Sequence, residues 1–147
     1  TVGLPFLLVP LRSIDAVKRA RVRTDLWQEH LQGRWAAEPM VFAVGRDADD
    51  ALLPAHVRGC DVRARVFVPG LSIPEDAATG SANACLAGYL AARTPRDGTL
   101  QWEVAQGVEM GRPSRLSIEA QKSDARLTAI RVGGNTVLVN EGTMRVP

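Results

Sequence analysis

A carboxylate, a tight turn of small residues and the start of an apolar helix follow one another near the middle of the chain, in Glu75-Asp76-Ala77-Ala78-Thr79-Gly80-Ser81-Ala82. Backbone N–H groups at a helix N-terminus attract anions, and a carboxyl group beside them can take up and return a proton. This order of residues indicates a site that holds a small acidic substrate and moves one of its protons, with Asp76 as the acid/base group.

The helix that positions this turn is predicted over residues 82–92. These residues are small or strong helix formers, with no proline, no β-branched residue and no full charge. Because such a helix has no polar stripe, we expect it to be buried on nearly all sides. Thr79 and Ser81 are candidate N-caps. From spacing alone, Asp76 is equally well explained as a turn or capping aspartate without chemistry.

The stretch EDAATGSA resembles the EDPATGSA signature of the PhzF-like family, which is named for a phenazine-biosynthesis isomerase and is related in fold to diaminopimelate epimerase. Further matching pieces occur in the family's order along almost the whole chain: Gly3 to Pro10, Arg65-Val66-Phe67-Val68-Pro69, Gln106-Gly107, Gly111-Arg112-Pro113-Ser114 and Gly133-Gly134. The chain departs from the signature at Ala77, where the family usually has proline. This change loosens the turn and removes no reactive group.

The resemblance implies an α+β fold, in which a β-barrel-like sheet wraps around a central buried helix. It also implies that residues 1–147 are one domain, the C-terminal half of a two-domain protein with its active site in the cleft between the halves. Asp76 would then be catalytic and would face a glutamate of the N-terminal half. We expect Thr79, Gly80, Ser81 and Ala82 to bind the substrate carboxylate.

We therefore expect a cofactor-independent isomerase that moves a proton or double bond on a small carboxylate-bearing biosynthetic intermediate. Two carboxyl groups that face each other in a closed cleft can divide the roles of acid and base. The implied partners are the N-terminal half as a separate chain and a second copy of the assembled protein, as a homodimer. A lyase or hydrolase that cleaves a C–C bond with the same site, or a non-catalytic binding relative, remains open.

The first residue suggests a further hypothesis, because Thr1 falls inside a segment that reads Ser-Thr-Gly-Leu-Pro in the family. A trimmed chain, a protease nick or a split gene would each explain this start. Self-cleavage is the chemical alternative, in which the Thr1 hydroxyl attacks the preceding carbonyl group.

Composition excludes several classes of protein. Hydrophobic residues make up 46% and charged residues 23% of the 147 residues, which is ordinary for a globular domain. A net charge of +2 with scattered arginines does not indicate a nucleic-acid surface. No apolar run approaches the ~18 residues of a membrane span, and we expect a cytoplasmic protein. The two cysteines, Cys60 and Cys85, are too few for a zinc site, and no metal ligand is assigned.

Strands and helices are expected to alternate around the central helix. Helices are predicted at Ser13–Arg21 and Thr24–Gln32. Strands are predicted at Leu4–Leu11, Met40–Val44, Arg63–Val68, Gln101–Ala105, Arg115–Ala120, Leu127–Val132 and Thr136–Val139, with a further short one at Met144–Val146. Gly133-Gly134-Asn135 is read as a hairpin turn.

Other residues that carry reactive or aromatic groups have simpler explanations. His30 and His56 lie outside the matching motifs and are expected at the surface. Trp27, Trp35 and Trp102 are expected to pack in the core or in the wall of a cleft. Arg65 and Arg112 are left out of the catalytic set.

Overall fold

The computed structural model describes residues 3–71 and 73–145. Thr1, on which the self-cleavage hypothesis rests, lies outside the described residues, and that hypothesis stays a prediction.

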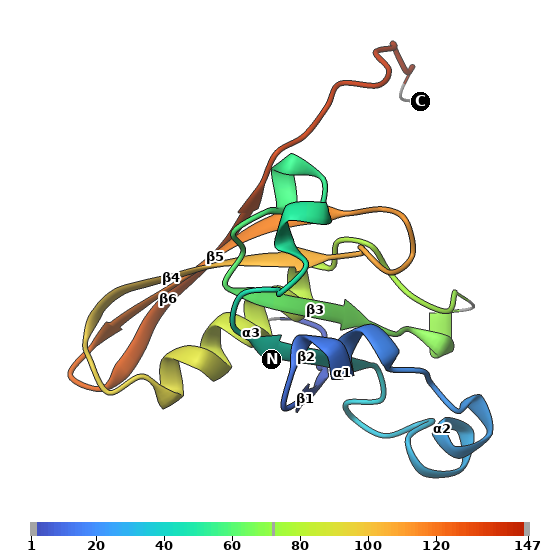
Figure 1. Ribbon diagram of the computed structural model, residues 1–147, viewed down its shortest axis with the longest axis horizontal. Helices are drawn as coiled ribbons and strands as arrows, with labels where there is room; N and C mark the ends of the chain where they lie inside the picture. Colours follow the sequence, from blue (N-terminus) through green and yellow to red (C-terminus); the bar gives the residue numbers. More distant parts are fainter. Residues whose placement is uncertain (1–2, 72, 146–147) are drawn as a thin grey trace.

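Within the described residues the chain forms six strands, three α-helices and three short 3-10 helices (Figure 1). In chain order they are β1 Leu7–Pro10, α1 Ile14–Arg19, α2 Thr24–His30, β2 Pro39–Val44, η1 Asp50–Leu52, η2 Ala55–Val57, β3 Val62–Val66, η3 Pro69–Leu71, α3 Gly80–Arg93, β4 Gly98–Gln106, β5 Ser114–Ser123 and β6 Arg126–Gly134. Both predicted early helices form, each shorter than expected. The Ser13 hydroxyl caps α1 by accepting a hydrogen bond from the Ala16 N–H, as the sequence indicates.

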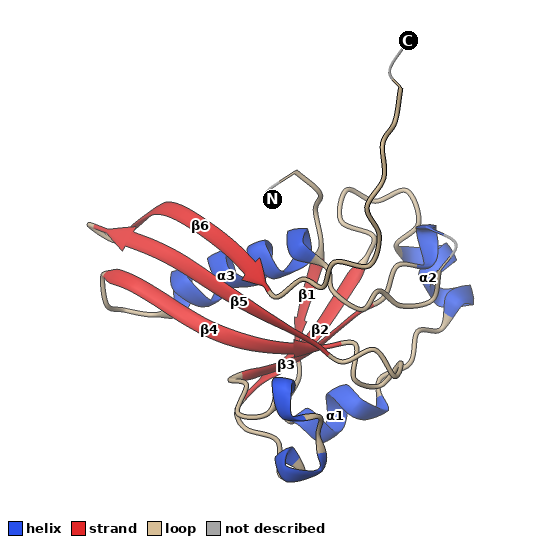
Figure 2. Ribbon diagram, turned by 90° about the horizontal axis from the view of Figure 1, so that it is seen from above, coloured by secondary structure: helices blue, strands red, loops and turns tan. Residues whose placement is uncertain are grey.

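The strands make one mixed sheet in the order β1-β2-β3-β4-β5-β6. The β1–β2 and β3–β4 pairs are parallel, and the other pairs are antiparallel. The sheet curls around α3, which lies against β4, β5 and β6 (Figure 2). This confirms the expected α+β architecture of a sheet wrapped around a central helix.

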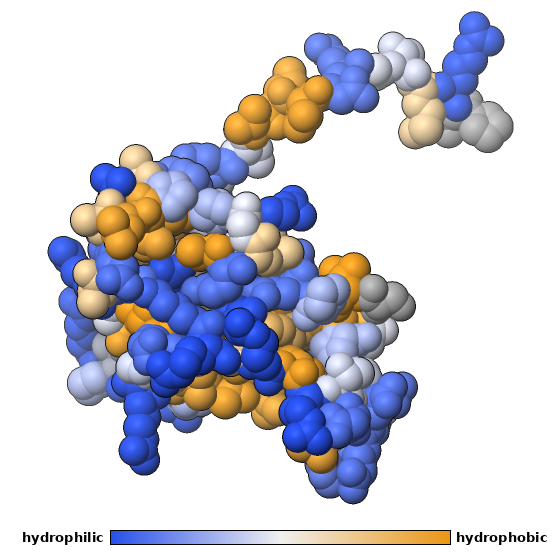
Figure 3. Space-filling view, turned by 45° about the vertical axis from the view of Figure 1, so that its right-hand side comes forward, coloured by the Kyte–Doolittle hydropathy of each residue, from blue (hydrophilic) through white to orange (hydrophobic). Residues whose placement is uncertain are grey.

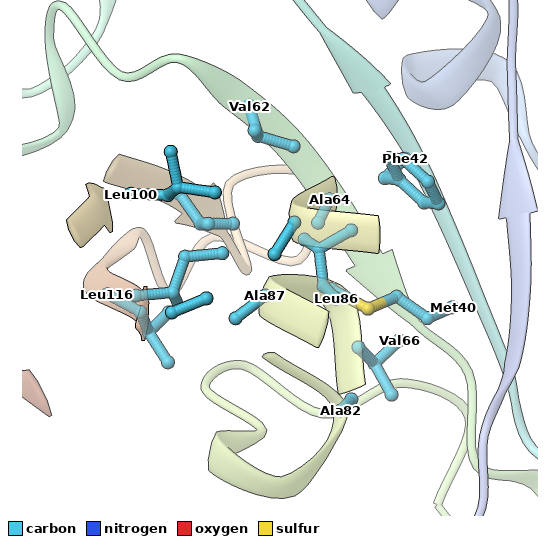
Figure 4. Close-up of a cluster of buried hydrophobic side chains, with 14 of the residues drawn as sticks. Met40, Phe42, Val62, Ala64, Val66, Ala82, Leu86, Ala87, Leu100 and Leu116 are labelled. Carbon is cyan, nitrogen blue, oxygen red and sulfur yellow. The ribbon is translucent and has the colours of Figure 1, made fainter. Parts of the chain in front are cut away.

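The core lies between α3 and the inner face of the sheet (Figure 4). Leu86 and Ala87 of α3 are fully buried there against side chains from four strands. Those side chains include Met40, Phe42, Val62, Ala64, Val66, Leu100, Val104, Leu116 and Ile118. The small side chains of α3 let the strands approach closely, which explains why a helix so poor in large residues holds the centre.

The prediction that α3 is buried on nearly all sides is only partly right. Cys85, Gly88 and Tyr89 are half-buried and line a groove of about 300 Å³ between α3 and the start of the chain. Trp35 is 74% exposed and lines the same groove, so of its two expected places it takes the wall of a cleft and not the core, whereas Trp27 is buried. The groove exists because the open sheet does not close between its edge strands, β1 and β6.

The end of the chain differs most from the prediction. Asp124 and Ala125 make the β5–β6 hairpin with positive φ angles of 51° and 61°, and β6 runs on through Gly134, so the hairpin read at Gly133-Gly134-Asn135 is wrong. Thr136–Val139 pairs with no strand of the described residues, which also contradicts the prediction. Met144 and Arg145 are likewise irregular, and Val146 lies outside the described residues.

We call residues 135–145 the projecting tail, because they leave the body of the molecule (Figure 1). Its apolar side chains stand out in Figure 3, and Val137, Leu138 and Val139 are 81–92% exposed. Apolar residues of high strand propensity without a covering surface are typical of a segment that pairs with another sheet.

The face of β3 that points away from α3 carries buried charges, which we call the outer ion cluster: Lys18, Asp47, Arg63, Arg65, Glu75 and Glu109. Arg63 is 2% exposed and lies between Asp47 and Glu109. Lys18 reaches Asp47 from α1 at 2.8 Å. Because each buried charge faces an opposite one, these ion pairs attach α1 to the sheet without leaving an isolated charge in the interior.

Candidate active site

The signature turn begins where the chain comes back alongside β3. The Asp76 N–H donates to the Val66 carbonyl oxygen at 2.9 Å, which makes an isolated antiparallel bridge. Three residues later α3 begins at Gly80. The bridge and the helix fix both ends of the turn, so the Asp76 side chain is held close to the N-terminus of α3.

The carboxylate of Asp76 is half-buried and accepts two hydrogen bonds from its own turn. Oδ1 accepts from the Ala77 N–H at 2.9 Å, and Oδ2 accepts from the Thr79 hydroxyl at 2.6 Å. Within the described residues no Lys, Arg or His makes an ion pair with it. Asp76 therefore has a fixed orientation and no cation that would neutralise it.

The departure from the family signature contributes to this geometry. Ala77 is buried, and its backbone N–H makes the bond to Oδ1. A proline at this position has no N–H to give. The alanine therefore adds a donor to the Asp76 carboxylate, an effect that could not be foreseen from the side-chain change alone.

Thr79 is the N-cap residue of α3 by position, but its side chain does not cap the helix. Its hydroxyl donates to Asp76 Oδ2 instead, so Thr79 is the N-cap by position and not by a side-chain hydrogen bond. Ser81 lies inside the first turn of α3, so it is not an N-cap either.

The first turn of α3 has the anion-attracting groups that the sequence predicts, with Gly80 exposed, Ser81 half-buried and Ala82 fully buried. The N–H groups of Gly80, Ser81 and Ala82 have no carbonyl group four residues earlier within the helix to bind. Gly80 is exposed, and a Cβ atom built on it would meet nothing within 4 Å, so the space in front of it is open. The structure thus brings Asp76, Thr79, Gly80, Ser81 and Ala82 together at one end of the helix. Which of them contacts a substrate stays a prediction.

A buried amide, which the candidate set omits, joins the turn to the sheet. Gln106, at the end of β4, is fully buried and donates through Nε2 to the Asp76 carbonyl oxygen at 2.8 Å and to Thr79 Oγ1 at 3.0 Å. Its Oε1 accepts from Asn83 Nδ2 at 2.7 Å and from the Thr79 N–H at 3.3 Å. We call Asp76, Thr79, Asn83 and Gln106 the signature cluster. The only signal of this role in the sequence is the Gln-Gly pair among the family motifs.

A close backbone contact explains why the second residue of that pair, Gly107, is a glycine. Its φ is +74°, and a Cβ atom there would lie 2.3 Å from the Arg112 carbonyl oxygen and 2.8 Å from that of Ala77. Only glycine fits this contact, which presses the turn before β5 against the signature turn. Arg112 contributes here through its backbone, since its N–H donates to the Gly107 carbonyl oxygen at 2.9 Å.

Glu75 and Arg65 support the turn from the other side of β3. Arg65 makes two hydrogen bonds to the Glu75 carboxylate, at 3.0 and 2.7 Å. It also donates to three carbonyl oxygens at the end of α1, those of Val17, Lys18 and Ala20. The hydrogen bond to Glu75 raises the pKa of Arg65 above its ordinary value. Arg65 is therefore a structural anchor for the residue next to Asp76.

The remaining candidates lie elsewhere. His30 and His56 are both exposed, and a ring nitrogen of His56 lies 3.0 Å from the Pro113 carbonyl oxygen. Burial raises the pKa of the Cys60 thiol above its ordinary value. Among residues 3–71 and 73–145, no group of three or more His, Cys, Asp or Glu side chains is placed to hold a metal ion. No helix in the same ranges has the length and apolar character needed to cross a membrane.

Comparison with solved structures supports the fold. The crystal structure of a Bacillus anthracis phenazine biosynthesis protein of the PhzF family superposes with a TM-score of 0.71 and 20% identity, and the match covers 90% of this chain and 42% of that one.

Comparison with curated proteins shows the family. An uncharacterized isomerase of Mesorhizobium japonicum is 35% identical over 146 residues, which cover 97% of this chain and 45% of the relative. A trans-2,3-dihydro-3-hydroxyanthranilate isomerase of Pseudomonas aeruginosa is 44% identical over 80 residues, 54% of this chain and 29% of that protein. The chain thus spans less than half the length of these relatives. The model of the phenazine biosynthesis-like protein family, PhzC-PhzF, matches residues 1–142, and the chain belongs to this family.

Proposed function

We propose that this chain is the Asp76-bearing part of a cofactor-independent isomerase that moves a proton on a small carboxylate-bearing intermediate. The observation that carries the proposal is the position of the Asp76 carboxylate, which is hydrogen-bonded, unpaired with any cation among the described residues and set beside the open N-terminus of α3. The names of the relatives, which are isomerases, support the same reaction class.

In this mechanism the substrate carboxylate binds the free N–H groups of the first turn of α3, with the Ser81 hydroxyl as a further donor. That binding brings a neighbouring carbon atom to Asp76. Asp76 then takes a proton from carbon, and a second acid returns a proton at a different carbon. Return at another carbon gives an isomerase, and return on the opposite face of the same carbon gives an epimerase.

The second acid is proposed to come from the portion of the relatives' length that this chain does not span. The projecting tail and the groove beside α3 supply exposed apolar surface on which such a portion could pack. We propose that it is the N-terminal half, present as a separate chain, and that the assembled protein is a homodimer. Because one of two catalytic groups is missing, the 147-residue chain alone is expected to be inactive.

The test uses trans-2,3-dihydro-3-hydroxyanthranilate, the compound named for the Pseudomonas relatives, in deuterated buffer. The chain is incubated alone and together with the N-terminal portion of its full-length protein. Turnover only by the combination, with one deuterium bound to carbon in a product of otherwise unchanged mass, is the expected result. Turnover by the chain alone would contradict the proposal.

The other outcomes of this experiment separate the remaining classes. A released fragment would indicate a lyase or hydrolase. Binding of the substrate without exchange of deuterium would indicate a non-catalytic relative. Either result would overturn the isomerase assignment.

A further inference from the structure

Every hydrogen in the signature cluster has one possible direction, and this assigns the proton of the Thr79 hydroxyl. The Asp76 carbonyl oxygen only accepts hydrogen bonds, so the group of Gln106 that faces it at 2.8 Å must be the amide nitrogen. The Gln106 oxygen then faces Asn83 Nδ2 and the Thr79 N–H, which only donate. The orientation of the buried amide is therefore fixed by its four partners.

The second hydrogen of Gln106 Nε2 points at Thr79 Oγ1, 3.0 Å away. The threonine hydroxyl is thus an acceptor on that side and keeps one proton to donate. Asp76 Oδ2 lies 2.6 Å from the same oxygen and, when ionised, only accepts. The hydroxyl proton must therefore point at Asp76.

We infer that Gln106 is a positioning residue of the active site, which acts through Thr79 to fix the direction of the Asp76 carboxylate. This inference rests on the proposed catalytic role of Asp76 and adds a residue to that mechanism. The chain of donors runs from Asn83 on α3 to Gln106 on β4, and then through Thr79 to the carboxylate.

The benefit for catalysis is geometric. With Oδ2 held by Thr79 and Oδ1 held by the Ala77 N–H, the carboxylate cannot rotate about its Cβ–Cγ bond without losing a hydrogen bond. Its remaining lone pairs therefore keep one direction, which is what proton abstraction from carbon at close range requires. Gln106 touches no substrate in this arrangement.

Two nearly isosteric substitutions test the inference in the assembled protein. Gln106→Glu replaces the two N–H donors of Nε2 by a carboxyl oxygen, which has at most one proton to donate, and keeps an acceptor for Asn83. Thr79→Val removes the hydroxyl and keeps the shape. With trans-2,3-dihydro-3-hydroxyanthranilate as substrate, each is expected to lower kcat by about 10- to 100-fold, because a misplaced catalytic group costs on that order. KM is expected to stay within about threefold, since the N–H groups of α3 are unchanged.

Three controls separate positioning from general loosening of the turn. Thr79→Ser keeps the hydroxyl and is expected to restore kcat to within about threefold of the wild type. Gln101→Glu changes an exposed glutamine on the same strand and is expected to leave both constants unchanged. The Gln106→Glu/Thr79→Val double variant is expected to be no slower than the slower single variant, because both changes act through the same Thr79–Asp76 hydrogen bond.

A rise in KM with unchanged kcat, or multiplication of the two losses in the double variant, would overturn the inference. A second measurement does not need activity. In crystal structures of the wild type and Gln106→Glu, the Thr79 Oγ1–Asp76 Oδ2 distance is expected to lengthen from 2.6 Å to beyond hydrogen-bonding range. An unchanged distance would also overturn it. If the wild type shows no turnover, the proposed function fails for this substrate, and the crystal structures still decide the role of Gln106.

Discussion

The two polar clusters on opposite faces of β3 are built in contrasting ways. In the outer ion cluster every buried arginine faces carboxylates. Arg63 lies between Asp47 and Glu109, and Arg65 pairs with Glu75. In the signature cluster, neutral amides and a hydroxyl surround one carboxylate, Asp76, which has no cationic partner among the described residues. The charges of the first cluster neutralise one another and hold elements together. The charge of the second is not neutralised and can act on a substrate.

The contrast teaches that burial of charge does not by itself identify a reactive site. Arg63 and Arg65 are among the most deeply buried polar groups of the chain, yet their contacts are all structural. Asp76 is less buried, and its hydrogen-bond donors orient it without cancelling its charge. We therefore expect substitutions in the signature cluster to change turnover and substitutions in the outer ion cluster to change stability.

The largest expected effect is on turnover. Asp76→Asn in the assembled protein is expected to lower kcat about 1,000-fold or more, within the range attributed to a general acid or base. The melting temperature of the chain should change by no more than a few degrees, because asparagine keeps the shape of the side chain and its one oxygen can still accept from the Ala77 N–H. Stopped-time product assays and thermal unfolding measure the two quantities, and a near-normal rate would remove Asp76 from the mechanism.

The matching substitution in the outer ion cluster is Asp47→Asn. It leaves Arg63, which is 2% exposed, without its closest partner. The free energy of unfolding is expected to fall by about 3 kcal/mol, as for other broken buried ion pairs. Urea unfolding measures it, and kcat of the folded assembled protein should stay the same. Asp25→Asn, which breaks an exposed pair with Arg23, is the control and should leave the unfolding midpoint unchanged.

Gly107→Ala tests the contact that joins the two turns. The new Cβ would fall 2.3 Å from the Arg112 carbonyl oxygen at a φ of +74°, so the backbone must shift. We expect a loss of about 2 kcal/mol in the free energy of unfolding, with a fall in kcat because Ala77 moves. Gly133→Ala is the matched control, since a Cβ there meets nothing within 4 Å. Equal stability of the two variants would contradict the close-contact explanation of Gln106-Gly107.

Acid should act on the outer ion cluster. Burial by itself would raise the pKa of Asp47, but hydrogen bonds from Lys18, the Asp49 N–H and Arg63 hold it below the ordinary value. The stability that Asp47 contributes is therefore present above about pH 4 and is lost as the pH falls through the lowered pKa. Urea midpoints measured from pH 7 to pH 2.5 should fall less steeply for Asp47→Asn than for the wild type. If the midpoints of the variant and the wild type fell in parallel with pH, Asp47 would not be the group responsible.

The smallest effect concerns the family difference at Ala77. Ala77→Pro restores the usual signature residue and removes the N–H that donates to Asp76 Oδ1. We expect kcat to change by less than about tenfold, because Thr79 still holds Oδ2 and proline stiffens the turn. A loss as large as that of Asp76→Asn would show that the Ala77 N–H is indispensable.

The elements around the site could be predicted because the order of apolar and polar residues along each segment largely determines whether it forms a helix or a strand. The apolar run of residues 82–92 gave α3, and alternating strands gave the sheet. The tail could not be predicted in this way, since Thr136–Val139 has strand propensity but no neighbouring strand among the described residues. The β5–β6 turn at Asp124 and Ala125 was missed because neither residue is a glycine, although both have positive φ.

Within the site, sequence alone located Asp76 and the helix N-terminus, which are contiguous. The sequence did not reveal the role of Gln106, which lies 30 positions after Asp76. The two residues come within hydrogen-bonding distance because β3 pairs with β4. Contacts of this kind depend on strand register, which the spacing of residues in one chain does not reveal.

The projecting tail has a practical consequence for anyone who purifies this chain. Val137, Leu138 and Val139 expose main chain and apolar side chains to the solvent, and the edge strands β1 and β6 each lack a second neighbour among the described residues. Concentrated samples should aggregate or bind chaperones. Limited proteolysis that removes about the last dozen residues should yield protein that aggregates more slowly.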